Sequence, residues 1–211
     1  MKKLLTILML LICTVTAADA AMTAAQRQSV IAKINKSVSS ISSMICDFTQ
    51  TKTLSLLNDR MVSSGKMYYK RANKLRWEYV SPYKYLFVFN GAKVYVANKS
   101  RKDVIDTKTN KLFKEVARIM MSTVTGTALS NSADFTIGLA DASSSCWQVT
   151  LVPKKREMKK MFSKIMLVFK KSDLMISEIN IYEKNNDKTN IKLRNITING
   201  AVNENLFAIP K

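Results

Sequence analysis

The hydrophobic and polar positions along the chain follow a helical spacing first and a strand-like spacing afterwards. Near the start, apolar residues recur every three or four positions, at Val30, Ile34, Val38, Ile41 and Ile45. This spacing places them on one face of an α-helix, and Thr23 is a suitable N-cap. We therefore predict a long amphipathic helix from Thr23 to about Met44 that covers another part of the protein with one face.

From Phe48 onward, apolar and polar residues alternate, as they do in half-buried β-strands. Turn-type pairs such as Ser81-Pro82 and Asn90-Gly91 separate the short segments. We expect about eleven strands, over residues 48–57, 62–69, 74–79, 85–90, 93–97, 101–107, 134–139, 147–152, 162–169, 174–182 and 189–198. Short turns between successive strands favour an antiparallel meander, and a sheet this long must curl or close.

A second helical pattern, from Lys111 to Ser122, interrupts the strands. Its apolar residues are Leu112, Phe113, Val116, Ile119, Met120 and Met121. Because they cover more than one side of a short helix, we expect this helix to lie inside the curve of the sheet. The predicted fold class is α+β, a curled antiparallel sheet with helices on one side. Residues 206–209 are expected to form a terminal extended piece.

The first twenty residues have the pattern of a secretory signal peptide. Met1-Lys2-Lys3 is basic, residues 4–17 are almost wholly apolar, and Ala18-Asp19-Ala20 is a small-residue cleavage site. We expect cleavage after Ala20 and a single mature domain of residues 21–211. Cys13 raises the alternative of a lipid anchor, but Ile12 stands where the processing of such anchors needs a small residue.

The chain is strongly basic, with 34 Lys and Arg against 15 Asp and Glu and a formal net charge of +19. For an exported protein this charge fits anionic lipid head groups, acidic proteins or simply a solvated surface. Nucleic acid is not expected as a partner, because the chain is exported and carries no recognition motif. The basic residues Lys154, Lys155, Arg156, Lys159, Lys160 and Lys164 are expected to lie on a surface loop between two strands.

The composition argues against catalysis and metal binding. The chain has no histidine, which removes the commonest general base and metal ligand. Acid pairs such as Asp103 with Asp106 fit loop and edge charges better than a catalytic pair. We therefore expect no enzyme activity, no cofactor and no metal. Cys46 and Cys146 are either paired in a disulfide or present as two buried free thiols, and we favour the second interpretation.

The segment from Lys74 to Gly91 is dense in aromatic residues. Alternation along a strand puts Leu75, Trp77 and Tyr79 on one face and Arg76 and Glu78 on the other. From these residues alone, the aromatic face could be an ordinary sheet core, a base-stacking surface or the lining of an apolar pocket.

Six short motifs follow one another along the mature chain. They are Asp47-Phe48-Thr49-Gln50, residues 65–73 (GKMYYKRAN), residues 75–79 (LRWEY) followed by Pro82, Asn90-Gly91 before an aromatic strand, residues 149–154 (VTLVPK) and residues 205–210 (NLFAIP). In this order they make the chain resemble the outer-membrane lipoprotein carrier family (LolA), periplasmic chaperones of Gram-negative bacteria. The chain departs from the family at Ala72, where proline is frequent.

The resemblance implies a half-closed antiparallel barrel whose helices form a lid over an apolar cavity. Family members receive a lipoprotein from an inner-membrane, lipoprotein-releasing ABC transporter, shield its acyl chains in the periplasm and pass it to an outer-membrane acceptor. We accordingly expect a monomeric periplasmic carrier with lipoprotein acyl chains, that transporter and that acceptor as partners. The alternative is an exported lipid- or lipoprotein-sensing regulatory domain on the same fold, although such proteins normally carry a further domain.

The resemblance also carries expectations for individual side chains. The lipid-binding cavity is expected to be lined by Phe48, Met67, Tyr69, Leu75, Trp77, Tyr79, Val88, Val94, Ile119, Met120, Leu151, Met166 and Val168. Methionine suits such a pocket because its flexible side chain adapts to irregular apolar shapes. Arg71 is expected to control the lid, since a guanidinium group can bond several helix or loop carbonyls at once.

Overall fold

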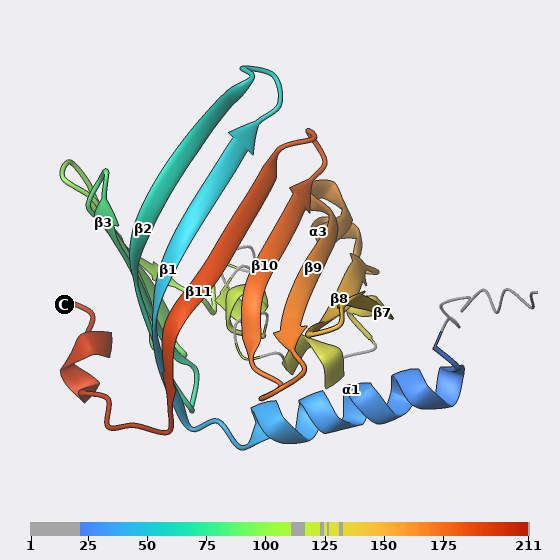
Figure 1. Cartoon of the computed structure of the whole chain (residues 1–211). Helices are drawn as coiled ribbons and strands as arrows, with labels where there is room; N and C mark the ends of the chain where they lie inside the picture. Colours follow the sequence, from blue (N-terminus) through green and yellow to red (C-terminus); the bar gives the residue numbers. More distant parts are fainter. Residues whose placement is uncertain (1–21, 111–116, 123–124, 126, 131–132, 211) are drawn as a thin grey trace, which may run out of the picture.

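The computed structural model describes residues 22–110, 117–122, 125, 127–130 and 133–210. It is one open antiparallel sheet that curls around its own inner face, with helix α1 (Ala24–Ser39) across one end (Figure 1). The predicted α+β half-barrel is thereby confirmed. The expected signal peptide lies outside the described residues, as does the 111–116 part of the expected second helix. Residues 117–122 are helical, as predicted.

The sheet consists of two meanders that meet in its middle. Its strand order is β6-β5-β4-β3-β2-β1-β11-β10-β9-β8-β7. The strands are β1 (Ser43–Leu54), β2 (Asp59–Lys70), β3 (Lys74–Ser81), β4 (Tyr85–Phe89), β5 (Lys93–Ala97), β6 (Lys102–Asp106), β7 (Phe135–Ser143), β8 (Cys146–Pro153), β9 (Phe162–Lys170), β10 (Ile176–Glu183) and β11 (Lys188–Ile198). Between β6 and β7 the chain crosses to the opposite edge of the sheet, and the second meander returns until β11 pairs with β1.

Helix α1 begins where the sequence predicts and ends earlier. The Thr23 hydroxyl accepts from the backbone N–H of Gln26, and the Gln26 side chain accepts from the Thr23 N–H, which completes a capping box. The helix stops at Ser39, not near Met44, because serine side chains compete for backbone groups at its end. The Ser40 hydroxyl donates to the carbonyl of Ser37. The chain then turns directly into β1.

Two further expectations about local structure are wrong. The basic segment after β8 is not a loop but a short helix, α3 (Arg156–Met161), because Met158 is buried and anchors one face of the turn. The terminal piece expected to be extended begins as the 3-10 turn η2 (Glu204–Phe207). The Asn203 side chain caps this turn by accepting from the N–H of Asn205.

The sheet buries both of its faces, but unequally. The inner face carries the main hydrophobic core, to which α1 adds Ile34 and Val38. On the outer face, Phe207 packs with Val88 and Tyr95, so the C-terminal segment covers β4 and β5 from outside (Figure 1). Glu204 holds this segment in place through ion pairs with Lys70 and Lys74. The C-terminal segment therefore packs on the face of the sheet opposite the main core.

The pairing of β2 with β3 is irregular next to Phe48 of β1. The register between β2 and β3 shifts at Ser64 and Gly65, and Gly65 lies opposite Phe48 of β1. A Cβ at Gly65 would be 1.9 Å from the carbonyl oxygen of Glu78 and 2.8 Å from Cζ of Phe48. Only glycine allows this approach, so Gly65 lets the aromatic residues of β1 and β3 come together on the inner face.

Replacing Gly65 with alanine should therefore be costly. We expect Gly65→Ala to lower the free energy of unfolding by about 3 kcal/mol or more, since the added methyl group meets backbone as well as a buried ring. Chemical denaturation of the two proteins measures the difference. Gly138→Ala is the matched control, because its nearest neighbour would be 3.8 Å away. Equal losses in the two variants would contradict the steric explanation.

Candidate functional site

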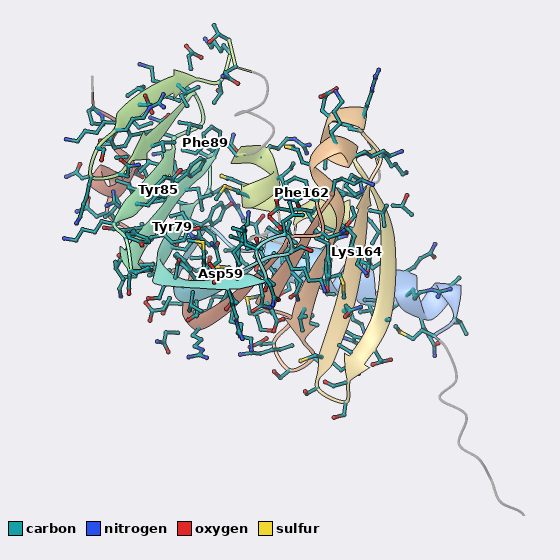
Figure 2. The ribbon with its side chains drawn as sticks, turned by 90° about the horizontal axis from the view of Figure 1, so that it is seen from above. Asp59, Tyr79, Tyr85, Phe89, Phe162 and Lys164 are labelled. Atoms are coloured by element: carbon teal, nitrogen blue, oxygen red, sulfur yellow. The ribbon has the colours of Figure 1, made fainter. Side chains whose placement is uncertain are left out.

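An apolar cavity of about 230 Å³ opens on the inner face between the two meanders. It is lined by Gln50, Trp77, Tyr79, Ile119, Met120, Phe162, Ile165, Ile179, Ile181, Thr189 and Ile191. None of these described lining residues carries a charge. Seen from above, Tyr79 and Phe162 come from opposite parts of the sheet (Figure 2). The seam between β1 and β11 forms the floor, through Gln50, Thr189 and Ile191.

One wall of the cavity is a cluster of aromatic rings. Phe48 contacts Trp77 with ring centroids 4.7 Å apart and Tyr79 with centroids 5.0 Å apart at 81°. Tyr79 in turn meets Tyr85 edge to face at 5.7 Å. Edge-to-face and tilted contacts of this kind stabilise aromatic clusters beyond simple burial. The aromatic segment of β3 thus serves two of the three roles considered above, since Leu75 is core and Trp77 and Tyr79 line the cavity.

The polar atoms of this wall are neutral. The Tyr79 hydroxyl donates to Oε1 of Gln50 at 2.9 Å. Burial, with a smaller contribution from Tyr85, raises the pKa of Tyr79 to about 12, so the phenol stays protonated at physiological pH. The Trp77 indole Nε1 is buried near this hydroxyl, and among the described residues no atom lies in hydrogen-bonding geometry to it. The wall therefore offers a ligand an apolar surface without a charged group.

Ten of the thirteen predicted cavity residues lie on the inner face. They are Phe48, Met67, Tyr69, Leu75, Trp77, Tyr79, Val94, Ile119, Met120 and Leu151, all within or packed against the main core. Four of them, Trp77, Tyr79, Ile119 and Met120, border the cavity itself. Whether any of them contacts lipid stays a prediction.

The expectation is wrong for Val88, Met166 and Val168, which point to the outer face. Val88 pairs with Arg76 in register and packs against Phe207. Met166 and Val168 alternate with Ile165, Leu167 and Phe169, which are the buried residues of β9. Both sides of β9 are apolar in its middle, so hydrophobicity alone could not choose between them. The signal that could have decided is Lys164 and Lys170, which share the parity of Met166 and Val168.

Sequence reasoning missed the floor of the cavity and its far wall. The lining residues that it did not name are Gln50, Phe162, Ile165, Ile179, Ile181, Thr189 and Ile191. Those on β10 and β11 follow from the pairing of β11 with β1, which places Ile191 opposite Gln50. No local pattern shows that the first strand pairs with the last, so this wall could be found only with the register known.

Arg71 ties the end of α1 to the turn between β2 and β3. Its Nη2 donates to the carbonyl oxygens of Ser39 at 2.5 Å and Ile41 at 3.1 Å, and its backbone N–H donates to the carbonyl of Ser42 at 2.7 Å. Ala72 and Asn73 follow with φ of 69° and 63°. Proline cannot adopt such a φ, so this turn differs in shape from one with proline at that position. The contacts with helix and loop carbonyls are those expected of Arg71; its control of a lid stays a prediction.

The inserted helix of residues 117–122 is held in place by buried apolar side chains and by an ion pair. Ala117, Ile119 and Met121 are buried in the main core. Arg118 forms an ion pair with the buried carboxylate of Asp134, which also binds Lys155 at 2.8 Å. Burial alone would raise the pKa of Asp134, but the Lys155 hydrogen bond and the charges of Arg118 and Lys155 lower it below its usual value. The helix is thus fixed to the start of β7 and α3.

The remaining reactive groups do not form a second site among the described residues. Cys46 and Cys146 are both free; Cys46 is buried, whereas Cys146 is only partly so, which corrects the expectation of two buried thiols. Burial raises the pKa of Cys46 to about 12, so its thiol is protonated. The described part of the chain brings together no three Cys, Asp or Glu side chains that could hold a metal ion. It also contains no helix of the length and apolarity needed to cross a membrane.

Known proteins resemble this chain in sequence or in fold. A curated "Outer-membrane lipoprotein carrier protein" from Methylococcus capsulatus is 26% identical over 111 residues, which are 53% of this chain and 51% of that protein. The match thus spans about half the length of that relative. The crystal structure of an uncharacterized conserved protein from Thermus thermophilus is similar with a TM-score of 0.54 at 10% identity, over 88% of this chain and 94% of the other. MucB is similar with a TM-score of 0.50 at 7% identity, over 88% and 63%.

The family comparison covers more of the sequence than the curated relative does. The model of the family "Outer membrane lipoprotein carrier protein LolA" matches residues 39–210, which include all eleven strands, the cavity and Arg71. Because the match covers most of the chain, the protein belongs to the outer membrane lipoprotein carrier protein LolA family.

Proposed function

We propose that the protein is a periplasmic carrier that binds the acyl chains of lipoproteins in the inner-face cavity and moves them from the inner to the outer membrane. The observation that carries this proposal is the uncharged, aromatic and aliphatic cavity on the curled sheet of a LolA family member. An acyl chain in water costs about 0.8 kcal/mol per exposed CH₂. A carrier must therefore offer apolar surface for the whole journey, and this cavity supplies it without a buried charge.

We infer from the size of the cavity that this conformation is the closed one. At about 230 Å³ it is smaller than the ~300–1,000 Å³ typical of small-molecule pockets, and a lipoprotein carries long acyl chains. Loading must then enlarge it, by moving residues that now fill the interior. Ile119 and Met120 of the inserted helix are the lining residues that do not belong to the sheet. We infer that this helix gives way on loading, together with α1, which Arg71 holds.

The proposed carrier takes its cargo from an inner-membrane ABC transporter and passes it to an outer-membrane acceptor. Exposed cations of α3 and the preceding turn, among them Lys154, Arg156, Lys159 and Lys160, offer a docking surface for an acidic partner. The carrier itself uses neither nucleotide nor metal in this scheme. A sensing domain on the same fold would bind lipid equally well but would not release it to an acceptor, so hand-over separates the two functions.

Binding of acyl chains can be followed by the cavity's own tryptophan. We expect a triacylated lipopeptide to displace a fluorescent apolar probe and to shift the emission of Trp77, because Trp77 borders the cavity and is 2% exposed. Trp77→Phe should remove the emission shift but keep the displacement. Ile181→Phe, which fills the cavity, should weaken probe binding about tenfold, whereas Val104→Phe on an exposed strand should not. Unchanged emission and no displacement would refute the proposal.

Loss of the Arg71 contacts should favour the open conformation. Each hydrogen bond from a charged group is worth roughly 1.5–3 kcal/mol, and the Arg71 side chain makes one to Ser39 at the end of α1 and one to Ile41 in the turn that follows. We expect Arg71→Leu to load lipoprotein normally but to hand it over at least about tenfold more slowly, and Arg71→Lys not to restore hand-over because it lacks the planar fork.

The matched control for this experiment is Arg101→Leu, since the Arg101 side chain is 77% exposed and forms an ion pair with Asp103, two positions along the chain. Loading and transfer to the acceptor are scored separately with a labelled lipoprotein. A variant that transfers at the unmodified rate, or one that fails only at loading, would show that Arg71 does not hold the lid.

A further inference from the structure

The hairpin of β1 and β2 ends in a strongly apolar tip. Its turn, residues 55–58, contains Leu56, which is 90% exposed, and Leu57, which is 72% exposed. Met61 and Val62 follow on β2 with 45% and 52% exposure. Single exposed apolar residues are common on protein surfaces, but turns favour small and polar residues. Four large apolar residues within one hairpin end are therefore a feature that the fold itself does not need.

This tip projects beyond the rest of the sheet. The pairing of β2 with β3 ends at Ser64 opposite Ser81, and that of β1 with β11 ends at Thr53 opposite Lys188. Residues 54–63 consequently pair only within the hairpin. At about 3.3 Å per residue, the unpaired stretch of β2 extends roughly 16 Å past β3. Figure 1 shows the hairpin rising above all neighbouring strands.

Polar contacts at its base hold the hairpin in this position. The backbone N–H of Ser55 donates to Oδ1 of Asp187 at 2.9 Å, and Lys52 forms an ion pair with Glu183 at 3.1 Å. Asp187 is buried, and Asn185 donates to its second oxygen at 2.9 Å. The turn between β10 and β11 thus binds the base of the β1–β2 hairpin and fixes its direction. Leu56 and Leu57 are held exposed to solvent as a result.

We propose that the tip, defined as Leu56, Leu57, Met61 and Val62, docks the protein on a lipid bilayer by inserting its leucines among the acyl chains. A narrow, convex turn cannot supply the ~800 Å² per partner that stable protein interfaces bury, but it can enter a bilayer. Arg60, Lys184 and Lys188 are exposed around it at the depth of the head groups. The nearby acids Glu183 and Asp187 are engaged by Lys52, and Asp59 accepts from the backbone of Arg60.

Docking at the tip would bring the cavity close to the membrane. The lining residues Gln50, Ile181 and Thr189 lie in the same halves of β1, β10 and β11 as the tip, and α1 covers the opposite end of the sheet (Figure 1). The cavity therefore lies closer to the tip end of the sheet than to the α1 end. When Leu56 and Leu57 touch a bilayer, the membrane faces the end that is closer to the cavity. This inference concerns the hairpin alone and does not depend on what the cavity carries.

Vesicle binding tests the proposal directly. The protein, without residues 1–20, is mixed with vesicles of phosphatidylethanolamine and phosphatidylglycerol and separated by flotation. We expect the double variant Leu56→Ser with Leu57→Ser to bind at least about tenfold more weakly than the unmodified protein, since two inserted leucines are lost. The matched control is Val104→Ser with Val152→Ser, which removes two exposed valines of other strands, 44% and 42% exposed, and should bind as the unmodified protein does.

A second measurement reports insertion itself. Leu56→Trp should show emission shifted to the blue on adding vesicles and quenched by brominated acyl chains, whereas Trp147 and Trp77 of the unmodified protein should be quenched little. Arg60→Glu should weaken binding at low salt and much less at high salt, because head-group attraction is screened over about 8 Å at physiological ionic strength.

Three results would overturn the proposal. They are no vesicle binding by the unmodified protein, equal binding by the double leucine variant, or an emission of the Leu56→Trp variant that vesicles leave unchanged. A tip that instead docks on a protein would give the first or second result. Probe binding to the cavity in the double variant should match the unmodified protein, so failure of tip docking and failure of the carrier function can be told apart.

Discussion

Nine register pairs join β1 to β11, between Met44 opposite Ile198 and Thr53 opposite Lys188. Every other strand pairing in the sheet joins strands that are consecutive in the sequence. Closing this seam brings together segments more than 130 residues apart, so its entropic cost is the largest of any pairing. The cavity depends on the pairing of β1 with β11. These two strands form the floor of the cavity, and the strands that each meander adds form its walls.

The sequence pattern predicted those features of the fold that depend on neighbouring residues in the chain, such as strand positions, the start of α1 and the two faces of β3. Alternation located all eleven strands, and Thr23 as an N-cap marked the start of α1. The inner face of β3 also followed, since Arg76 and Glu78 left only one parity for Leu75, Trp77 and Tyr79. Because the polar face of this strand is unambiguous, the alternation of side chains along a strand assigns the other residues to the inner face.

The remainder depends on contacts that the sequence does not show. The middle of β9 is apolar on both sides, which is why Met166 and Val168 were assigned to the wrong face. Helix α1 ends at Ser39 because Arg71, from a distant turn, and the serines beside it take up its carbonyls. Leu56 and Leu57 looked like the end of a strand, and only the register shows them beyond every neighbour. Tertiary context overrides pattern at each of these positions.

The two edges of the sheet, β6 and β7, do not pair with each other. A closed barrel has a radius fixed by its strand number and shear, so it cannot widen without breaking a ladder of hydrogen bonds. An open sheet has no such restriction, because a small change of twist between successive strands moves its edges apart while every ladder stays intact. The curvature of this open sheet can therefore change, and with it the volume enclosed by its inner face, while all ten strand pairings stay intact.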